Sequence, residues 1–578
     1  MTRLTIYPAV DPQDLLWERT KFSRGLFPLA LGAALCAVVP IAARAADIAP
    51  PMRLVVNSNS DGPIQADREL TLREAIAVTN GVLPLQQLSV EERAQAIVSD
   101  PGQPTRIEFD LPLGQTTIYL AELLPPLARP NLILDGTTQP AFAASAADLE
   151  VDIETPKVAI APADGVEVPR GLMVMADGIT IQGLSLYGFN AAHRATATAP
   201  PADIFISDRL LLQDSPAPEF AVQIPTDLQL DAPPQGVTIS GNWLGVAPRA
   251  GQSERTSAFG IFAFNSQGVL IESNYIARHN GSAILSGLRA KNLRAIGNTI
   301  VENGRAGMPD AIRLEGNIAG SEIVGNSIEG NGGSGVYLFG TEGAVRIEQN
   351  RMIQNGRRLE RAAVYLVGRD HQVRDNSIAG QPGPGVAIAA YPHSEGNVIR
   401  GNCFADLDGL SIDLVARRHG GVQELQVGDG PNLPCDSRNR RRDTANGAID
   451  APQWLSPEFF SLGGTVVLDG IAEPDSEVDL YLVDNPTGSG YAPLQQQVRT
   501  TTAGEDGRFS FELSVPVGSG VSAIATHPRY GTSEPSRVAV VQSLDGVTLS
   551  EEDAAEFLAR EPHCQKLTNS LSVRGGGP

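Results

Sequence analysis

The segment LRAIGNTI, Leu293–Ile300, is one copy of a motif that recurs through the middle of the chain and decides the fold. The motif reads Φ-x-Φ-x-x-Asn-x-Φ, where Φ is usually apolar, and its copies lie within Val237–Phe404. Its asparagines are Asn242, Asn274, Asn298, Asn326, Asn350, Asn376 and Asn402. A repeat period in the twenties indicates a solenoid, in which each unit buries its apolar face only against its neighbours.

The residues around each asparagine alternate between apolar and polar, which is the period of a β-strand. A second alternating run follows each asparagine after about ten residues. These runs are Gly260–Phe264, Ser282–Ser286, Ala311–Glu315, Gly335–Phe339, Ala363–Val367 and Gly385–Ala389. Two or three strands per coil, stacked in parallel, predict a parallel β-helix. A leucine-rich repeat is the alternative, but its leucine spacing and its helical half are missing.

The recurring asparagine has a structural interpretation that we prefer to a ligand-binding one. Asparagine tolerates the left-handed backbone conformation that a sharp corner needs. Stacked asparagine amides also form hydrogen bonds between identical side chains. The Asn-Gly pairs that follow predict a second turn in the same coils; they are Asn280-Gly281, Asn303-Gly304, Asn331-Gly332 and Asn355-Gly356.

Composition limits the partners of this chain. With 44 basic and 66 acidic residues, the formal net charge is −22. This charge disfavours nucleic acid and anionic membrane surfaces as partners. Anionic polysaccharides would need a local basic patch or a bridging cation. We therefore expect a polysaccharide or a protein of the cell envelope as the partner.

The N-terminus predicts export. A basic segment that includes Arg24 is followed by the apolar run Leu26–Ala42 and by Ala43-Arg44-Ala45. This order is typical of a secretory signal that is cleaved before Ala46. The alternative is an uncleaved membrane anchor, because the run approaches the length that spans a bilayer. We expect a secreted, cell-surface or periplasmic protein of a bacterial envelope, with no membrane span in the mature chain.

Export permits disulfide bonds. Cys403 and Cys435 are the natural pair, which would join the last coil to the loop after it and contribute about 3–4 kcal/mol. Cys564 is then free or forms an intermolecular bond. The alternative is that all three cysteines are unpaired.

Before the repeats, the spacing of Leu72, Ala75 and Ile76 predicts a short amphipathic helix. Such a helix would cover the open first coil of a solenoid. The segment VVNSNSDGPIQADRELTLREAIAVTN, Val55–Asn80, resembles the N-terminus of secreted bacterial proteins named for a Cys-Ser-Leu-Arg-Glu-Ala motif. Here Leu70-Thr71 replaces Cys-Ser. The resemblance implies a right-handed β-helix of the pectin-lyase-like kind and implies no activity, because that family has no shared catalytic motif.

Further segments extend the resemblance and complete the domain plan. Residues 135–140, 428–432 and 444–450 also resemble that family. Beyond them, short alternating runs between Trp454 and Gln542 indicate a β-sandwich, similar to immunoglobulin-like modules of exported proteins. The basic run Arg438–Arg442 is a solvated linker or a docking site for an acidic partner. We predict a signal peptide at 1–45, a strand and helical cap at 46–103, the β-helix at 104–436, a linker at 437–451, the sandwich at 452–542, and a tail with a short helix at 543–578.

The outward residues of the second strand form two columns that suggest a binding face. We assign Phe262, Ile284, Arg313, Tyr337, Tyr365 and Ala387 to one, and Phe264, Ser286, Glu315, Phe339, Val367 and Ala389 to the other. Exposed aromatic rings in a row suit the flat faces of sugars. The candidate ligand-binding residues are Phe262, Phe264, Arg313, Tyr337, Phe339 and Tyr365. Alternatively, loops or the C-terminal module cover this stripe.

Catalytic chemistry has less support. A hydrolase needs two carboxylates at a defined separation, and a lyase commonly needs carboxylates with a basic residue. The candidates are Asp310, Asp370 and Arg374, and no ordered column of carboxylates accompanies them. We expect no cofactor. Ca²⁺ binding by Asp406, Asp408, Asp413 and Asp429 is an alternative to their roles in turns.

The sequence therefore predicts an all-β, right-handed parallel β-helix with an N-terminal helical cap and a C-terminal immunoglobulin-like sandwich. Its function is expected to be the non-catalytic binding of polysaccharide or of a protein partner. A polysaccharide lyase, hydrolase or epimerase acting along the same face is the alternative. An envelope spacer is a third possibility.

Overall fold

The computed structural model describes residues 50–140, 153–191, 201–208, 232–248, 255–340, 343–391, 393–416, 426–434, 436–439, 442–483 and 490–544. These residues lie in one compact unit, which begins at residue 49. Among them, no helix has both the length and the apolar character needed to cross a bilayer. The predicted signal peptide and the predicted helix near Ser550 lie outside the described residues.

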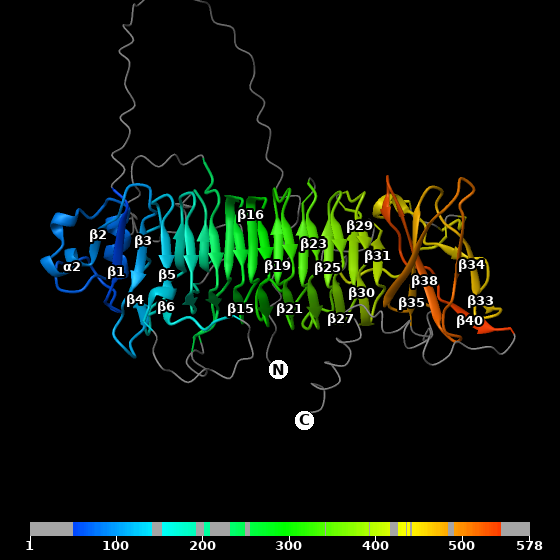
Figure 1. The fold of residues 1–578 in the computed structure, drawn as a ribbon, viewed down its shortest axis with the longest axis horizontal. Helices are drawn as coiled ribbons and strands as arrows, with labels where there is room; N and C mark the ends of the chain where they lie inside the picture. The colour runs from blue at the N-terminus through cyan, green and yellow to red at the C-terminus, as the bar shows by residue number, and fades with distance from the viewer. Residues whose placement is uncertain are drawn as a thin grey trace, which may run out of the picture. The chain divides into compact units, whose positions relative to one another are not determined.

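Three long sheets of stacked strands form a parallel β-helix (Figure 1). Sheet A contains, in spatial order, β2 (Ala96–Val98), β1 (Met52–Val56), β3 (Arg106–Phe109), β5 (Ile133–Asp135), β8 (Thr180–Gln182), β11 (Thr238–Ser240), β14 (Leu270–Glu272), β17 (Arg294–Ile296), β20 (Glu322–Val324), β23 (Arg346–Glu348), β26 (Gln372–Arg374) and β29 (Val398–Arg400). Every pair in it is parallel except β1 with β2.

The other two sheets carry the remaining strands of each coil. Sheet B contains β4 (Thr117–Leu120), β6 (Val158–Pro162), β9 (Leu184–Leu186), β12 (Trp243–Leu244), β15 (Tyr275–Ala277), β18 (Thr299–Val301), β21 (Ser327–Glu329), β24 (Arg351–Ile353), β27 (Ser377–Gln381) and β30 (Cys403–Leu407). Sheet C contains β7 (Arg170–Val174), β10 (Ala202–Ile206), β13 (Ile261–Gln267), β16 (Ile284–Lys291), β19 (Ile312–Glu315), β22 (Val336–Phe339), β25 (Val364–Val367), β28 (Val386–Ala389) and β31 (Ile412–Val415).

The core is built from columns of aliphatic side chains that stack in register between coils. In sheet A, Ile271 pairs with Ala295 and Ala295 pairs with Ile323, and all three are fully buried. In sheet B, Ile276 and Ile300 continue the same arrangement. Burying one such isoleucine contributes about 2 kcal/mol. The alternation seen in the sequence therefore sets the inward faces as predicted.

The corner between sheets A and B differs from the sequence prediction in one respect. The residue with a positive φ is the one before each asparagine, as in Ser273 (52°), Gly297 (61°) and Gln349 (56°), and the asparagine itself is not left-handed. This turn of the backbone breaks the predicted single strand into two, such as β14 and β15. The preceding position is often glycine because a left-handed conformation costs glycine little.

The asparagines form a hydrogen-bonded ladder, which confirms their predicted structural role. Asn326 is buried, and its Oδ1 accepts from the backbone N and from Nδ2 of Asn298, each at 2.9 Å. Its Nδ2 donates to Asn350 Oδ1 at 2.9 Å, and also to the carbonyls of Ala295 and Val324. A second ladder at the corner between sheets B and C joins Asn303, Asn331 and Asn355.

One strand of sheet C is shifted from its predicted register. The sequence assigned Ile284 to an outer column, but Ile284 pairs with Ile261 and lies in the core, whereas Leu285 pairs with Phe262 on the outer face. The register that places Ile284 in the core stacks it on Ile261 and Ile312 of the adjacent strands. Ile284 therefore does not belong to the outer column to which the sequence assigned it.

Helix α1 (Leu72–Thr79) packs at the first coil and contains the segment that carried the family resemblance. Thr71 and Glu74 form a capping box that begins the helix. Arg73 donates from Nε and Nη2 to Asp61, and Asp61 also accepts from the backbone N of Ala121. Three short helical segments follow in the chain: η2 (Leu85–Gln87), α2 (Val90–Ala94) and η3 (Gly136–Thr138).

The C-terminal module comprises residues 453–543 and is made of two antiparallel sheets of short strands, apart from one parallel pair. One sheet contains β32 (Gln453–Trp454), β34 (Val466–Ile471) and β37 (Arg508–Leu513). The other contains β33 (Glu458–Ser461), β40 (Ala539–Ser543), β38 (Gly520–His527), β35 (Glu477–Val483) and β36 (Gln496–Thr502), with β39 (Gly531–Thr532) beside β38. Before the module, η6 (Asn446–Ala448) lies against β39.

Cys403 begins β30, is buried and forms a disulfide. Its predicted partner Cys435 lies outside the described residues, as does Cys564. The pairing of Cys403 with Cys435 therefore stays a prediction.

Candidate functional site

The outer face of sheet C brings most of the predicted ligand-binding residues together. Its register stacks Phe205, Phe262, Leu285, Arg313, Tyr337 and Tyr365 on successive strands. The expectation that these aromatic rings form an exposed stripe is wrong. Phe262, Tyr337 and Tyr365 are 1%, 2% and 1% exposed, because other apolar side chains lie against them.

Two apolar clusters account for this burial. Around Phe262, side chains including Ala258, Phe259 and Met308 pack over the sheet. Around Tyr337, the second cluster includes Ala362, Val367 and Val415, with Phe339 at its edge. The outer face of sheet C is thus a second, smaller core rather than an open aromatic surface.

Tyr337 and Tyr365 stack with ring centroids 5.0 Å apart and an interplanar angle of 22°. Arg313 is on the strand at the other side of Tyr337, and its guanidinium lies over the Tyr337 ring, with Cζ 3.9 Å from the ring centroid. Stacking of this kind adds about 1 kcal/mol to the effect of area burial. Burial raises the pKa of Tyr337 to about 12 and also raises the pKa of Tyr365. Both phenols are therefore neutral at physiological pH.

Asp310 is joined to this stack through Arg313 and is fully buried. One of its oxygens accepts from Arg313 Nη1 at 2.8 Å, and the other accepts from the backbone N of Ser334 at 2.9 Å and from Arg361 Nη1 at 3.2 Å. Arg313 also pairs with Glu315 through Nε at 2.6 Å. The two acidic and two basic side chains therefore neutralise one another.

Sequence reasoning missed Arg361, which is 5% exposed and essential to this network. It ends the run Arg357–Arg361, whose other members are exposed. The run resembles a solvated loop, and the sequence contains no signal that distinguishes Arg361 from Arg357 and Arg358. Only the coil geometry brings Arg361 beside Asp310, which lies 51 residues earlier.

Beside the buried column runs a row that remains partly accessible, which we call the sheet C row: Phe264, Gly287, Glu315 and Phe339. Glu315 pairs with Phe339 on the next strand, and the Phe264 ring lies against Gly287, where a Cβ would come within 2.5 Å of it. All four residues are of intermediate exposure. This is the part of the predicted face that solvent and a ligand can reach.

The remaining catalytic candidates lie elsewhere. Arg374 ends β26 in sheet A, and Asp370 is an exposed residue with φ of 61° in the turn before that strand. Asp310 precedes β19 in sheet C, so Asp370 and Arg374 do not join its network. Asp406 and Asp408 are exposed, whereas Asp413 is buried. Within the described ranges, no three His, Cys, Asp or Glu side chains are placed to hold a metal ion.

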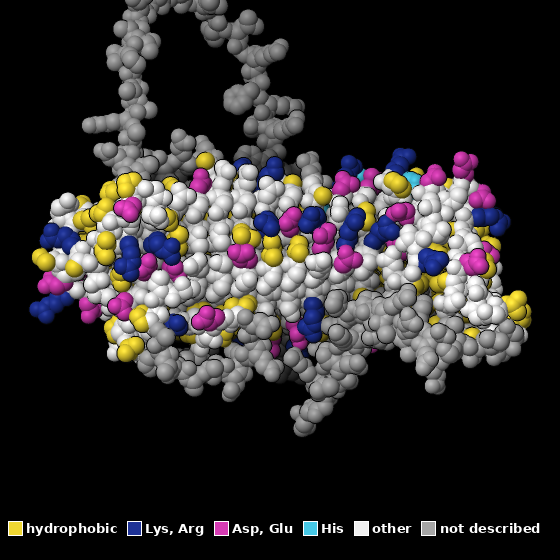
Figure 2. Space-filling model, viewed as in Figure 1, with side chains coloured by type: hydrophobic (Ala, Val, Ile, Leu, Met, Phe, Trp, Pro, Cys, Tyr) yellow, Lys and Arg dark blue, Asp and Glu magenta, His cyan; other side chains and the backbone are white. Residues whose placement is uncertain are grey.

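Sheet A presents charged side chains of both signs. Figure 2 shows basic and acidic side chains alternating along a row over the part of the molecule that contains β23 and β29. Glu322 pairs with Arg294 at 3.1 Å and with Arg346 at 3.5 Å. Opposite charges on adjacent strands thus pair with each other across sheet A. At such exposed positions each pair contributes about 0–1 kcal/mol.

A buried acidic group lies where the last coil meets the C-terminal module. Glu534 accepts hydrogen bonds from the backbone N of Leu414 at 3.1 Å and of Asn432 at 2.7 Å. Asp413 accepts from the backbone N of Gly430 at 3.0 Å. Burial raises the pKa of Glu534 to about 7, and burial together with Glu534 raises the pKa of Asp413.

The raised pKa of Glu534 predicts a pH dependence of stability. The contribution of Glu534 to the free energy of unfolding is fully present below the ordinary glutamate pKa of about 4.5. It is lost as the pH rises through about 7, since the buried carboxyl group must then ionise. Between pH 4.5 and pH 8, ionisation of Glu534 is expected to lower the free energy of unfolding of the wild-type protein by about 3 kcal/mol. Urea unfolding at several pH values checks this, with Glu534→Gln as the comparison. An equally steep decline in that variant would show that other groups cause it.

These features define the structural class of the protein: it is a β-helical solenoid with internal asparagine ladders and a covered outer face on sheet C. In sequence, residues 235–404 match the family model described as a right handed beta helix region. Among curated proteins, none matches this chain. The matched region is the one that contains the asparagine repeat.

Solved structures show distant likenesses. A mutant of the periplasmic alginate epimerase AlgG is 12% identical, with 57% of this chain and 69% of that chain covered and a TM-score of 0.32. The enzymatically active domain of bacteriophage CBA120 tailspike protein 2 is 10% identical, with 76% and 72% covered and a TM-score of 0.31. The A-module of Azotobacter vinelandii mannuronan C-5 epimerase AlgE4 is 12% identical, with 54% and 89% covered and a TM-score of 0.26. Likenesses of this size do not establish a shared activity.

Proposed function

We propose that this protein is an exported, non-catalytic β-helix protein that binds a carbohydrate polymer along the sheet C row. The observation that carries the proposal is the partial exposure of Phe264, Glu315 and Phe339 on one face beside an otherwise covered column. Phe264 and Phe339 are three strands apart, which is about 14 Å. Two apolar rings separated by hydrogen-bonding groups suit a chain of sugar rings, which have flat apolar faces and hydroxyl edges.

The charges beneath the row favour binding over catalysis. A general base needs a pKa near the working pH, whereas the pKa of Tyr337 is raised to about 12. Asp310 and Glu315 share the guanidinium of Arg313, and Asp310 also pairs with Arg361. Neither carboxylate is free to act as a nucleophile or proton acceptor without breaking an ion pair.

Export and the finer domain assignments belong to the same proposal. The basic and apolar segments of residues 19–45 support a signal peptide and a location in the bacterial envelope or outside the cell. We take α1 as the cap of the first coil and the C-terminal module as an immunoglobulin-like sandwich, in keeping with their positions in the chain and their strand patterns. A partner protein of the envelope is the second candidate ligand.

The test uses the chain from residue 46 with a panel of neutral and acidic polysaccharides. Phe264→Ala combined with Phe339→Ala is expected to weaken binding to one polymer at least about tenfold, because each lost ring contact contributes about 1 kcal/mol. Co-sedimentation or calorimetry measures this. Arg346→Ala on sheet A, a half-exposed residue on another face, is the matched control and should leave binding unchanged.

The same mixtures report on the alternative function. New reducing ends or unsaturated products, assayed with and without Ca²⁺, would replace the binding proposal by a hydrolase or lyase and direct attention to Asp310. Failure to bind any polymer would instead favour a protein partner or a spacer role in the envelope.

A further inference from the structure

A basic patch lies beside the sheet C row, on the same outer face of the solenoid. Strand β16 places Arg289 and Lys291 on this face, because Ala290 between them is buried in the core. Their Cα atoms are about 7 Å apart, since each residue of a strand rises by about 3.3 Å. Both side chains are partly accessible to solvent. Gly287 of the row precedes Arg289 by two residues, so the patch and the row are neighbours on one strand.

Amide side chains flank the two basic residues. On β13, past a bulge in its pairing with β16, Asn265 pairs with Arg289. The next outward residue of β13, Gln267, pairs with Lys291. On the other side, Asn317, which follows β19, pairs with Arg289. Paired residues on adjacent parallel strands lie about 4.8 Å apart. The patch is therefore surrounded by neutral hydrogen-bonding groups from both neighbouring strands.

The two carboxylates beside the flanking amides make other contacts. Asp208 accepts from Asn265 Nδ2 at 2.7 Å, and Glu315 pairs with Arg313 through Nε at 2.6 Å. Within the described residues, no carboxylate lies at ion-pair distance from Arg289 or Lys291. The described part of the chain therefore does not neutralise the charge of this patch.

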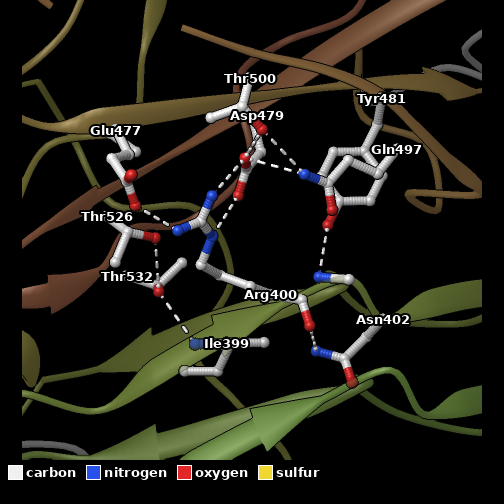
Figure 3. A network of polar contacts seen from close by, with 12 residues as sticks. Ile399, Arg400, Asn402, Glu477, Asp479, Tyr481, Gln497, Thr500, Thr526 and Thr532 are labelled. Carbon is white, nitrogen blue, oxygen red and sulfur yellow. Dashed lines mark hydrogen bonds and ion pairs between the residues drawn. The ribbon is translucent and has the colours of Figure 1, made fainter. Parts of the chain in front are cut away.

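Other arginines on the outer strand faces do pair with carboxylates. Arg400, at the end of β29, is the clearest case (Figure 3). Its Nε and Nη2 donate to the two oxygens of Asp479 at 2.7 and 2.8 Å, and its Nη1 pairs with Glu477. The arginines of sheet A strands that pair likewise are Arg53, Arg106, Arg294 and Arg346. In a chain with a formal net charge of −22, two neighbouring basic residues without such a partner favour an external anion as the source of the opposing charge.

We propose that Arg289 and Lys291 form a binding site for a tetrahedral oxyanion, namely the sulfate or phosphate ester group of a sugar polymer that lies on the sheet C row. This inference rests on the proposed function, since the row would hold the sugar rings and the patch their acidic substituents. Arginine presents a planar fork of donors, and lysine presents a compact charge with three donors. Together with the amides of Gln267 and Asn317, these donors come from three adjacent strands. Such a set suits an ester group with three terminal oxygens better than a planar carboxylate with two.

The test uses the chain from residue 46 and four probes: dextran, carboxymethyl dextran, dextran sulfate and dextran phosphate, with the charged polymers at matched substitution. Calorimetry measures binding. We expect the sulfate or the phosphate polymer to bind most tightly, which also identifies the ester. Arg289→Gln combined with Lys291→Gln is expected to weaken that binding at least about tenfold, because two charge-assisted contacts are lost. Added salt should weaken binding of the wild-type protein more steeply than binding of this variant.

The matched control is Arg294→Gln combined with Arg346→Gln, which removes the same charge from sheet A and should leave binding unchanged. An equal loss in this control would show that the charge of the whole surface, and not the patch, binds the polymer. Carboxymethyl dextran that binds as tightly as the ester polymers would overturn the choice of a tetrahedral group. A wild-type protein that binds none of the charged polymers would overturn the site itself.

The same probes separate this site from the sheet C row. Phe264→Ala combined with Phe339→Ala removes the rings of the row and leaves the patch intact. If only the arginine and lysine variant loses binding, the oxyanion site stands and the row does not hold the polymer. If only the phenylalanine variant loses binding, the row stands and the oxyanion site is wrong. Thermal unfolding checks that each variant is folded, and Arg289→Lys, which keeps the charge, should retain most of the binding.

Discussion

Asn326→Ala is expected to lower the free energy of unfolding by about 3–5 kcal/mol, because it removes a side chain from the middle of the buried ladder. Asn326 accepts twice from Asn298 and donates to Asn350 and to two carbonyls. Alanine would remove these hydrogen bonds, and each buried group that is left unsatisfied costs about 1–3 kcal/mol. Asn298 Nδ2 and Asn350 Oδ1 keep one other partner each, Ile271 O and the backbone N of residue 326. Urea or thermal unfolding followed by far-ultraviolet circular dichroism measures the loss.

Asn317→Ala provides the control for this prediction. Asn317 is exposed and follows β19, where only its backbone pairs with Arg289, so replacing its side chain is expected to change stability by less than about 0.5 kcal/mol. Asn326→Asp should be at least as damaging as Asn326→Ala, since it removes the donors and buries a charge. Equal stability of Asn326→Ala and Asn317→Ala would contradict the ladder as a main source of stability.

Asp310→Asn is expected to lower the free energy of unfolding by about 3–5 kcal/mol, although asparagine keeps the shape of the side chain. The change removes the only negative charge that the structure places against Arg361 within the described residues, and Arg361 is 5% exposed. Breaking a buried pair in this way leaves an uncompensated charge. The unfolding midpoint in urea measures the effect.

The comparison is Glu322→Gln, which breaks exposed pairs on sheet A and is expected to cost about 0–1 kcal/mol. The two variants also separate the functional alternatives. A stable Asp310→Asn protein that had lost an enzymatic activity would support a catalytic role for Asp310. A destabilised protein with unaltered polysaccharide binding after refolding would support the structural role proposed here.

Much of the solenoid follows from the sequence because its order is local and repeated. Alternation predicted the strands of each coil, and Ile271, Ile300 and Leu314, which lie at apolar positions of these strands, are each fully buried. The asparagine corner was recognised, but its left-handed residue was placed one position too late. The error has a physical reason, since asparagine and the residue before it are both compatible with a turn, and only the backbone φ separates them.

Less of the candidate site could be predicted from the alternation and repeats of the sequence. Arg313, Tyr337 and Tyr365 were grouped in one column, and the structure stacks them in that order. The exposure of the two tyrosines was predicted wrongly, because alternation assigns a side chain to the outer face but does not show that its neighbours on that face, such as Ala362 and Val415, pack closely enough to bury it. The register of β16 was missed by one residue because both Ala283 and Ile284 are apolar and alternation cannot choose between them.

By itself, the sequence determined the repeat, the strand alternation and the asparagine ladder, because these depend on spacing within one coil and on copies of the same residue type. Only the tertiary structure decided that Arg361 neutralises Asp310, that the aromatic column is covered, and that Arg400 joins the last coil to Asp479. These contacts link residues that are 51 or 79 positions apart. Their partners are single residues without a period, so nothing in the sequence pairs them until the coils stack.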